Sequence, residues 1–195
     1  MRILDLTTAA TAVLLGAVPL ASARAQEGAN RDSVQADARL VRHALADNML
    51  EVRLGEVAQH KAGNKAVQGF AQRMVTDHQR LEDQWKDLAR KYGITVTDTL
   101  GPMGKQRVQH MQGVDRSSFD KDYMTAMLKA HADDVDHLRT VMDSVHSAPV
   151  RKLVDYERPI ILDHLKAAAA AAKEVGVDST VVNRSKEVAE GKAKT

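Results

Sequence analysis

The chain has 195 residues, of which 28 are Lys or Arg and 26 are Asp or Glu, so its formal net charge is only +2. This balance argues against a nucleic-acid-binding protein, because such proteins usually carry a pronounced basic face. The chain has no cysteine, which excludes disulfides, thiolate metal ligands and thiol catalysis. Aromatic residues make up 3% of the chain and strong helix formers dominate it, so we expect an all-α protein.

Residues 1–25 have the features of a secretion signal peptide. Arg2 provides a positive start, residues 6–20 are apolar apart from three threonines, and small residues follow at the cleavage positions. Two A-x-A patterns end here, and we favour cleavage after Ala25. We therefore expect an exported, periplasmic protein, in which no later segment is long and apolar enough to span a membrane.

The first helical hairpin follows a short N-terminal segment at residues 26–34. Apolar residues recur at three- and four-residue spacing over residues 33–62 and again over residues 65–92, which predicts two long helices. Gly63 and Asn64 mark a short turn between them, with Asn64 as the N-cap of the second helix. A turn this short predicts that the two helices are antiparallel.

A second hairpin follows a long connection. Residues 93–116 contain several glycines and a proline, so we expect a crossover that travels the length of the bundle, with room for a short helix at residues 105–111. Residues 117–145 and 149–173 then form the second pair of helices. Pro159 lies inside the last of these, where we expect a kink.

Two hairpins joined by a long crossover have the connectivity of a ferritin-like, antiparallel four-helix bundle, which we expect over residues 35–173. A short second connection would instead give a simple up-down-up-down order. Residues 174–195 form a polar C-terminal tail that we expect to fray.

Each predicted helix carries one residue of a metal-binding type in its apolar stripe, namely Glu51, His78, His131 and His164. A buried polar group without a partner costs about 1–3 kcal/mol, so these four positions need a physical reason. Counting residues from the turns, at about 1.5 Å of rise per residue, places the three histidines in one layer of the bundle, with Glu51 within a turn of it.

Three imidazoles and a carboxylate form a credible ligand set for Zn²⁺, Cu²⁺ or Fe²⁺. The set differs from that of di-iron bundles, which use four carboxylates and place a Glu three residues before each of two histidines. The corresponding positions here are Val75 and Ile161. The alternative is that the four polar side chains form a buried network that fixes the register of the helices.

Four further residues are weaker candidates. Met74 and Met127 each lie four residues before a histidine, on the same helix face. A Met/His environment would suit copper(I). The alternative role of these two residues is core packing. Asp77 directly precedes His78 and points about 100° away from it, so it is a candidate for orienting a neighbouring side chain. Asp134 belongs to an acidic stretch of the third helix.

A set of short motifs spread over residues 35–170 forms a recognisable pattern. The motifs are Asn48-Met49-Leu50-Glu51, Leu54-Gly55-Glu56-Val57-Ala58, Val67-Gln68-Gly69-Phe70-Ala71, Met74-Val75-Thr76-Asp77-His78, Phe119-Asp120-Lys121-Asp122-Tyr123, His131, Pro159 and His164-Leu165. This pattern resembles a widespread bacterial family of unknown function with a ferritin-like fold, whose members are often labelled predicted outer membrane proteins. The resemblance implies export, an association with the cell envelope, and polar core roles for Glu51, Asp77 and the three histidines. It implies no established activity.

Two functions are compatible with the sequence. The first is a periplasmic metal-binding bundle that protects against metal or oxidative stress. The second is a non-enzymatic envelope protein, in which a structural or partner-binding bundle uses the histidines only for stability. A membrane-surface protein is disfavoured because the chain lacks a strongly basic face. The sequence has no nucleophile with its base, phosphate loop or nucleotide fingerprint, and it does not decide whether the protein is an enzyme.

Overall fold

The structure is a computed structural model that describes residues 20–192, with side chains from residue 31 onward. The described residues form six α-helices and one short 3₁₀ helix and contain no strand, which confirms the all-α prediction. The chain divides into two units, residues 1–32 and 33–195, and the second contains the helical bundle. The predicted signal peptide falls mostly on residues 1–19, outside the described part, so its cleavage stays a prediction.

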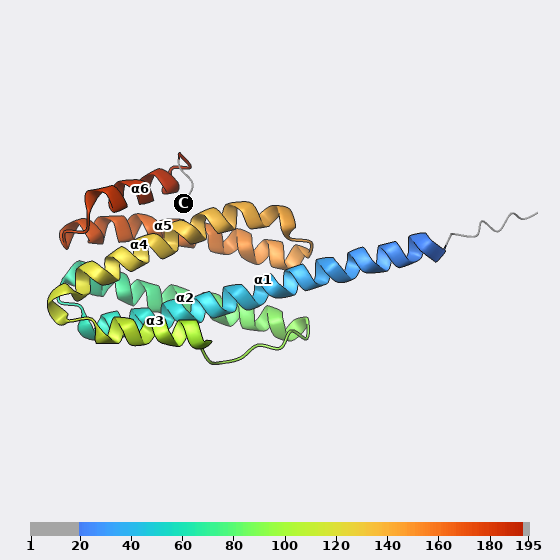
Figure 1. Cartoon of the computed structure of the whole chain (residues 1–195), viewed down its shortest axis with the longest axis horizontal. Helices are drawn as coiled ribbons and strands as arrows, with labels where there is room; N and C mark the ends of the chain where they lie inside the picture. Colours follow the sequence, from blue (N-terminus) through green and yellow to red (C-terminus); the bar gives the residue numbers. More distant parts are fainter. Residues whose placement is uncertain (1–19, 193–195) are drawn as a thin grey trace, which may run out of the picture. The chain divides into compact units, whose positions relative to one another are not determined.

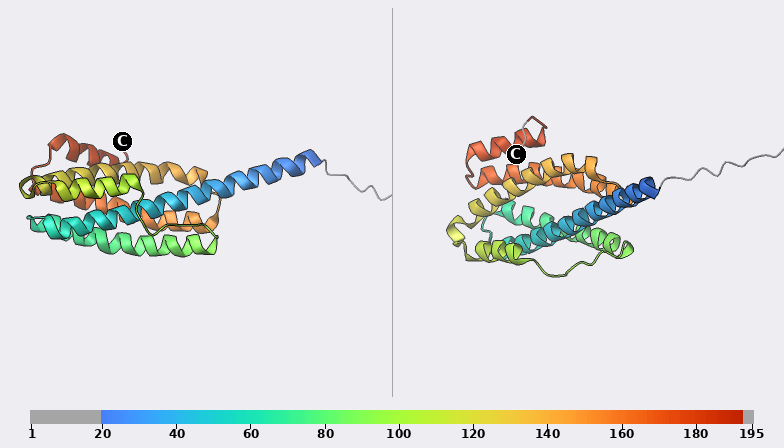
Figure 2. Two further views of the ribbon diagram at one scale, coloured as in Figure 1. Left: turned by 60° about the horizontal axis from the view of Figure 1, so that its bottom comes forward. Right: turned by 45° about the vertical axis from the view of Figure 1, so that its right-hand side comes forward.

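The elements in chain order are α1 (Leu20–Lys61), α2 (Lys65–Lys91), α3 (Pro102–Gly113), α4 (Arg116–Thr140), η1 (Val141–Ser144), α5 (Ala148–Glu174) and α6 (Ser179–Ala189). Within the second unit, α1, α2, α4 and α5 lie side by side around a shared apolar core (Figure 1). Two further views show the same arrangement, with α3 in the connection between α2 and α4 (Figure 2). None of the described helices has the length and apolar composition that crossing a membrane requires.

The turn between α1 and α2 is fixed by polar side chains at its two ends. Asn64 caps α2, because its side-chain oxygen accepts hydrogen bonds from the backbone N–H groups of Ala66 and Val67. Asp120 of α4 accepts from the backbone N–H groups of Gly63 and Asn64, at 2.7 to 3.1 Å. The predicted cap is therefore present, and α4 helps to hold the turn.

Gly55 allows α1 to approach α2 closely. A Cβ atom at this position would lie 2.8 Å from Cγ2 of Val75 and 3.2 Å from the carbonyl oxygen of Ala71. Contacts between carbon atoms are optimal near 3.5–4.0 Å, so any larger residue here would force the two helices apart.

The structure corrects two expectations about helix bounds. The third predicted helix, 117–145, is shorter than expected, because α4 ends at Thr140. In the turn that follows, Asp37 of α1 accepts hydrogen bonds from the backbone N–H groups of His146 and Ser147. In the crossover, α3 is longer than the predicted helix at residues 105–111. The last predicted helix is present as α5, with Pro159 inside it, and the kink at Pro159 stays a prediction.

The expectation of a fraying tail is wrong for the residues of α6. This helix packs against α4 and α5 and buries Val182, Ser185 and Val188. Asp178 caps it by accepting from the backbone N–H of Thr180. Three residues spaced three apart are enough to give a short polar helix one buried stripe.

Candidate metal centre

Three buried histidines from three different helices meet in the core. His78 lies on α2, His131 on α4 and His164 on α5, and each is at most 2% exposed. Their ring centroids are 5.0, 5.5 and 5.8 Å apart, and one ring nitrogen of each lies within 4.8 Å of those of the other two. The structure thus brings together the three histidines that turn counting places in one layer.

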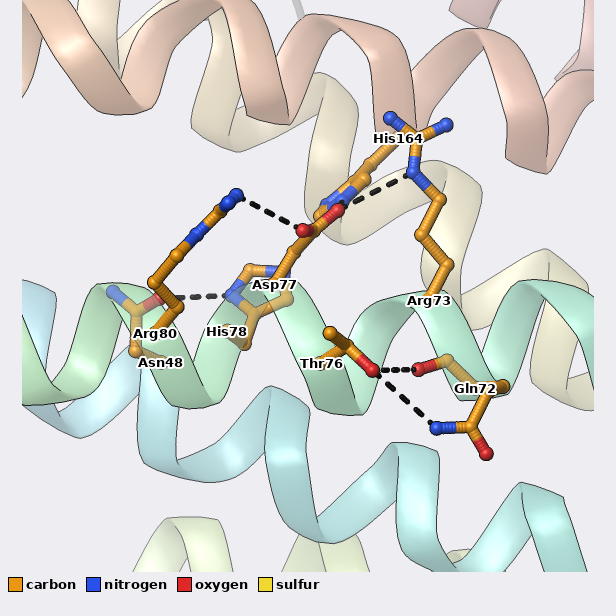
Figure 3. A network of polar contacts seen from close by, with 8 residues as sticks. All are labelled: Asn48, Gln72, Arg73, Thr76, Asp77, His78, Arg80 and His164. Carbon is orange, nitrogen blue, oxygen red and sulfur yellow. Dashed lines mark hydrogen bonds and ion pairs between the residues drawn. The ribbon is translucent and has the colours of Figure 1, made fainter.

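Two of these histidines use one ring nitrogen to contact a polar side chain from α1 or α2. Nδ1 of His78 lies 2.9 Å from Oδ1 of Asn48 on α1 (Figure 3). Nε2 of His164 lies 2.9 Å from Oδ2 of Asp77, which is the neighbour of His78 on α2. Both partners are oxygen acceptors, so the hydrogen of each ring resides on the contacting nitrogen.

His131 follows the same rule with a backbone partner. Its Nδ1 lies 3.0 Å from the carbonyl oxygen of Met127, one turn earlier on α4. A carbonyl can only accept, so this nitrogen also carries the hydrogen of its ring. Each of the three tautomers is therefore set by a hydrogen bond that the surrounding helices provide.

The second nitrogen of each ring is left without a partner. Nε2 of His78, Nε2 of His131 and Nδ1 of His164 are all buried, and none has a hydrogen-bond partner among the described residues. The two nitrogens of an imidazole point in nearly opposite directions, so these three lone pairs face away from the hydrogen-bond acceptors. Metal-ligating histidines almost always show this pattern, with one nitrogen on the metal and the other donating to a fixed acceptor.

Burial keeps the three rings neutral at pH 7. Burial, reinforced by His131 and His164, lowers the pKa of His78 well below its usual value. Burial and His164 lower the pKa of His131 to about 3, although its hydrogen bond to the Met127 carbonyl opposes the shift. Burial also lowers the pKa of His164, against the opposing effect of Asp77. All three histidines are therefore in the deprotonated form that binds metal ions.

Asp77 is held ionised by His164 and by two arginines on its own helix. Its oxygens lie 3.3 Å from Nε of Arg73 and 3.0 Å from a guanidinium nitrogen of Arg80 (Figure 3). Burial raises the pKa of Asp77, but the hydrogen bonds from His164 and Arg73 and the charge of Arg80 outweigh it, so the net shift is downward. The carboxylate therefore remains a permanent acceptor that orients the His164 ring.

The sequence interpretation missed a buried network behind His78. Asn48 donates from Nδ2 to Oε1 of Glu157 at 3.0 Å, and Trp85 donates from Nε1 to Oε2 of Glu157 at 3.1 Å. Since the Asn48 amide nitrogen is used in this way, its oxygen is the atom that accepts from His78. Burial raises the pKa of Glu157 to about 7, although the two hydrogen bonds oppose that shift.

Glu157 was missed because helical spacing counted back from His164 also fits a stripe through Ile160 and Tyr156. Tyr156 is 40% exposed, whereas Glu157 and Ile161 are 5% and 3% exposed, so the buried stripe runs through the latter pair. Position 157 lies seven residues before His164, which is two helical turns on the same face. A heptad count back from His164 would have found it.

The comparison with known families fits this region of the chain. A family model matches residues 21–171, a stretch that includes the three histidines and all their hydrogen-bond partners. The chain belongs to this family, which is described as a domain of unknown function (DUF4142). Membership confirms the resemblance noted from the short motifs. No curated protein and no solved structure matches the chain. The family has no assigned activity, so the geometry of the histidine centre is what indicates a function.

The other candidate ligands lie outside the cluster of ring nitrogens. Among residues 31–192, the histidines form the only group in which three or more potential ligand atoms from His, Asp or Glu lie within 4.8 Å of one another. Glu51 is 5% exposed and its Oε2 has no hydrogen-bond partner, but it and Asp134 line a neighbouring pocket. Met74 and Met127 belong to the apolar core, and Met127 contributes its carbonyl oxygen to His131.

Proposed function

We propose that this member of the DUF4142 family is an exported, ferritin-like four-helix bundle that binds one transition-metal ion through His78, His131 and His164. One observation carries the proposal. Three buried lone pairs belong to neighbouring histidines, and none has a hydrogen-bond partner among the described residues. A metal ion would satisfy all three at once, because zinc or copper ligation needs imidazole nitrogens about 2.0–2.1 Å from one point.

The alternative of a purely structural polar network fits this observation less well. In such a network each buried histidine would donate from one nitrogen and accept at the other. Here each ring accepts nothing, which leaves three unpaired lone pairs at a cost of about 1–3 kcal/mol each. Protonation of one ring would relieve the contact between lone pairs, but the lowered pKa values of all three histidines oppose it.

The ligand chemistry favours a divalent ion of the first transition row. Three neutral imidazoles suit Zn²⁺, Cu²⁺ and Fe²⁺, and affinity for nitrogen ligands rises along this row to Cu²⁺. Only three protein ligands meet, which would leave coordination positions open to water or a small molecule. The cluster contains no carboxylate, so the dinuclear iron chemistry of four-carboxylate bundles does not follow from the architecture.

The location and role extend this proposal. The side-by-side packing of α1, α2, α4 and α5 and the long connection between α2 and α4 support a ferritin-like order. The signal-like residues 1–25 support export to the periplasm. In that compartment the protein would sequester a redox-active or toxic metal ion and so protect against metal or oxidative stress. Fractionation of cells for the untagged protein tests the location.

Metal analysis of the mature chain, produced without a histidine tag, tests the binding site. We expect one equivalent of metal per chain after titration with Zn²⁺ or Cu²⁺. A free ion concentration of 100 times Kd should stabilise the fold by about 2.7 kcal/mol. For a chain of this size that corresponds to a rise in Tm of about 5–10 °C, which a chelator should reverse.

Two ligand variants and one control make the test specific. His131→Ala and His164→Ala should each abolish the metal-dependent rise in Tm, whereas His60→Ala should retain it because His60 is exposed on α1. For the Cu²⁺ form, electron paramagnetic resonance should show coupling to nitrogen nuclei. Binding at less than a tenth of an equivalent, or an unchanged rise in Tm in both ligand variants, would show that the histidines are not a metal site.

A further inference from the structure

A narrow acidic pocket lies beside the three-histidine centre. It has a volume of about 40 Å³, and side chains from α1, α2, α4 and α5 line it. Its carboxyl groups are Asp47, Glu51, Asp134 and Glu157, and we call it the acidic pocket. His78 is the one member of the histidine centre that lines it. The pocket therefore reaches the centre at His78.

The acidic side chains form a gradient of burial from solvent to His78. The Asp47 side chain is 45% exposed and lies 3.1 Å from the exposed His43, while Asp134 is half-buried. Glu51 and His78 are 5% and 2% exposed. A cation that enters at Asp47 would thus meet a carboxyl group at each depth before it reaches the first histidine.

Glu51 supplies a second and independent sign that the pocket takes a ligand. Its side chain is buried and lines the pocket, yet its Oε2 atom has no hydrogen-bond partner among the described residues. Burial, reinforced by Asp47, raises the pKa of Glu51 to about 8 despite the opposing charge of Arg107. An unpaired carboxyl oxygen inside a cavity is an available ligand for an ion that passes it.

The size and geometry of the pocket favour passage over storage. A volume of about 40 Å³ accommodates a partly hydrated ion or a few water molecules, given that one water needs about 10–15 Å³. Among residues 31–192, only the three histidines bring three potential ligand atoms within 4.8 Å of one another. The pocket carboxyl groups form no such set. An ion in the pocket would be held less firmly than at the histidines.

We propose that the acidic pocket is the route by which divalent cations reach the three-histidine centre, with Glu51 as the inner carboxyl group that passes the ion to His78. This inference rests on the proposed metal-binding function. A cation displaces the proton of a carboxyl group that it binds, so each pocket carboxyl group becomes a carboxylate ligand as the ion passes. Charge of one sign in a cleft raises the association rates of opposite charges by about 10–10³-fold, so the pocket carboxyl groups should control how fast the metal enters. They should have little effect on how tightly the histidines hold it.

Stopped-flow uptake of Co²⁺ by the metal-free, full mature chain tests this route, with the visible absorption of bound Co²⁺ as the signal. Glu51→Gln should slow uptake by about tenfold, and Asp47→Asn combined with Asp134→Asn should slow it by a similar factor. Release into excess chelator should slow to the same extent, so Kd should stay within about twofold of the wild type, because a route affects both directions equally. Glu56→Gln is the matched control, since Glu56 lies on the same helix and pairs with Arg53 away from the pocket.

The outcomes separate the two proposals. If the wild type binds Co²⁺ and Glu51→Gln takes it up at the wild-type rate, the route is wrong and the metal site stands. If Glu51→Gln releases the metal faster and weakens Kd, Glu51 is a ligand and the route is again wrong. If the wild type binds no metal, the proposed function fails and the route fails with it. Circular dichroism and Tm of each variant confirm that the fold is retained.

Discussion

Glu51→Gln should make the protein more stable at neutral pH, and by an amount that depends on pH. The folded pKa of Glu51 is about 8 against a reference value of 4.5, because burial and Asp47 disfavour the carboxylate. A carboxyl group with a raised pKa contributes its stability below the unfolded pKa, and that stability is lost as the pH rises towards the folded pKa. The wild-type protein therefore loses free energy of unfolding between about pH 4.5 and pH 8 through this group.

The size of the effect follows from these two pKa values. At about 1.4 kcal/mol per pKa unit, keeping Glu51 protonated costs about 1 kcal/mol at pH 5 and about 3 kcal/mol at pH 7. Glutamine has nearly the same shape and does not titrate. The difference in unfolding free energy between Glu51→Gln and the wild type should therefore grow by about 2 kcal/mol over this range.

Urea unfolding of the metal-free protein at pH 5, 6 and 7, followed by circular dichroism, measures this difference. Any constant effect of the amide cancels when the difference is compared between pH values. Glu56→Gln is the surface control, because the Glu56 side chain is 42% exposed and pairs with Arg53. A Glu51→Gln difference that stays flat from pH 5 to pH 7 would show that Glu51 titrates normally, and the account of the acidic pocket as a desolvated site would be wrong.

Three further predictions concern the packing of the helices. Gly55→Ala should destabilise the protein by about 1–3 kcal/mol in thermal unfolding, because its Cβ would lie 2.8 Å from a side-chain carbon of Val75. Gly69→Ala is the control: a Cβ there would have nothing within 4 Å, so this change should stabilise the protein by up to about 1 kcal/mol. Equal effects of the two changes would contradict the close helix contact. Asp120→Ala should cost about 1–2 kcal/mol in urea unfolding, since it removes the acceptor for the N–H groups of Gly63 and Asn64 in the turn before α2. A loss below about 0.3 kcal/mol would count against that role. Val182→Asp should increase proteolytic cleavage after residue 174, because Val182 is only 2% exposed and a buried carboxylate there would detach α6 from the bundle. An unchanged cleavage pattern would show that the packing of α6 does not depend on this contact.

Much of the fold and the histidine layer could be predicted from simple periodicity. Long helices with three- and four-residue spacing of apolar side chains are the strongest signal that a single sequence contains. The layer followed because residues at equal distance from a hairpin turn lie level, which needs only the helical rise. His78, His131 and His164 were found for that reason. The same count placed Glu51 near the layer, and it could not show that its side chain enters the acidic pocket.

The remaining features depend on angles that periodicity does not define. Spacings of three and four describe two adjacent stripes on α5, one with Tyr156 and one with Glu157, and only contacts with α1 and α2 select the second. The partner of His164 could not be predicted either, since Asp77 reaches it from a neighbouring helix. The C-terminal helix was missed because its three buried residues are spread over a polar segment whose composition is typical of a tail.

The four bundle helices contribute different parts of the site. The three histidines come from α2, α4 and α5, and none of the three lies on α1. Helix α1 instead supplies Asn48, which sets the tautomer of His78, and Glu51 and Asp47, which line the acidic pocket. A metal ion at the histidines would therefore tie α2, α4 and α5 together across the long crossover, while α1 would control access. The close approach at Gly55 holds α1 against α2, and this contact keeps Asn48 within reach of His78. On this account the packing of α1 and the chemistry of the centre cannot be varied independently.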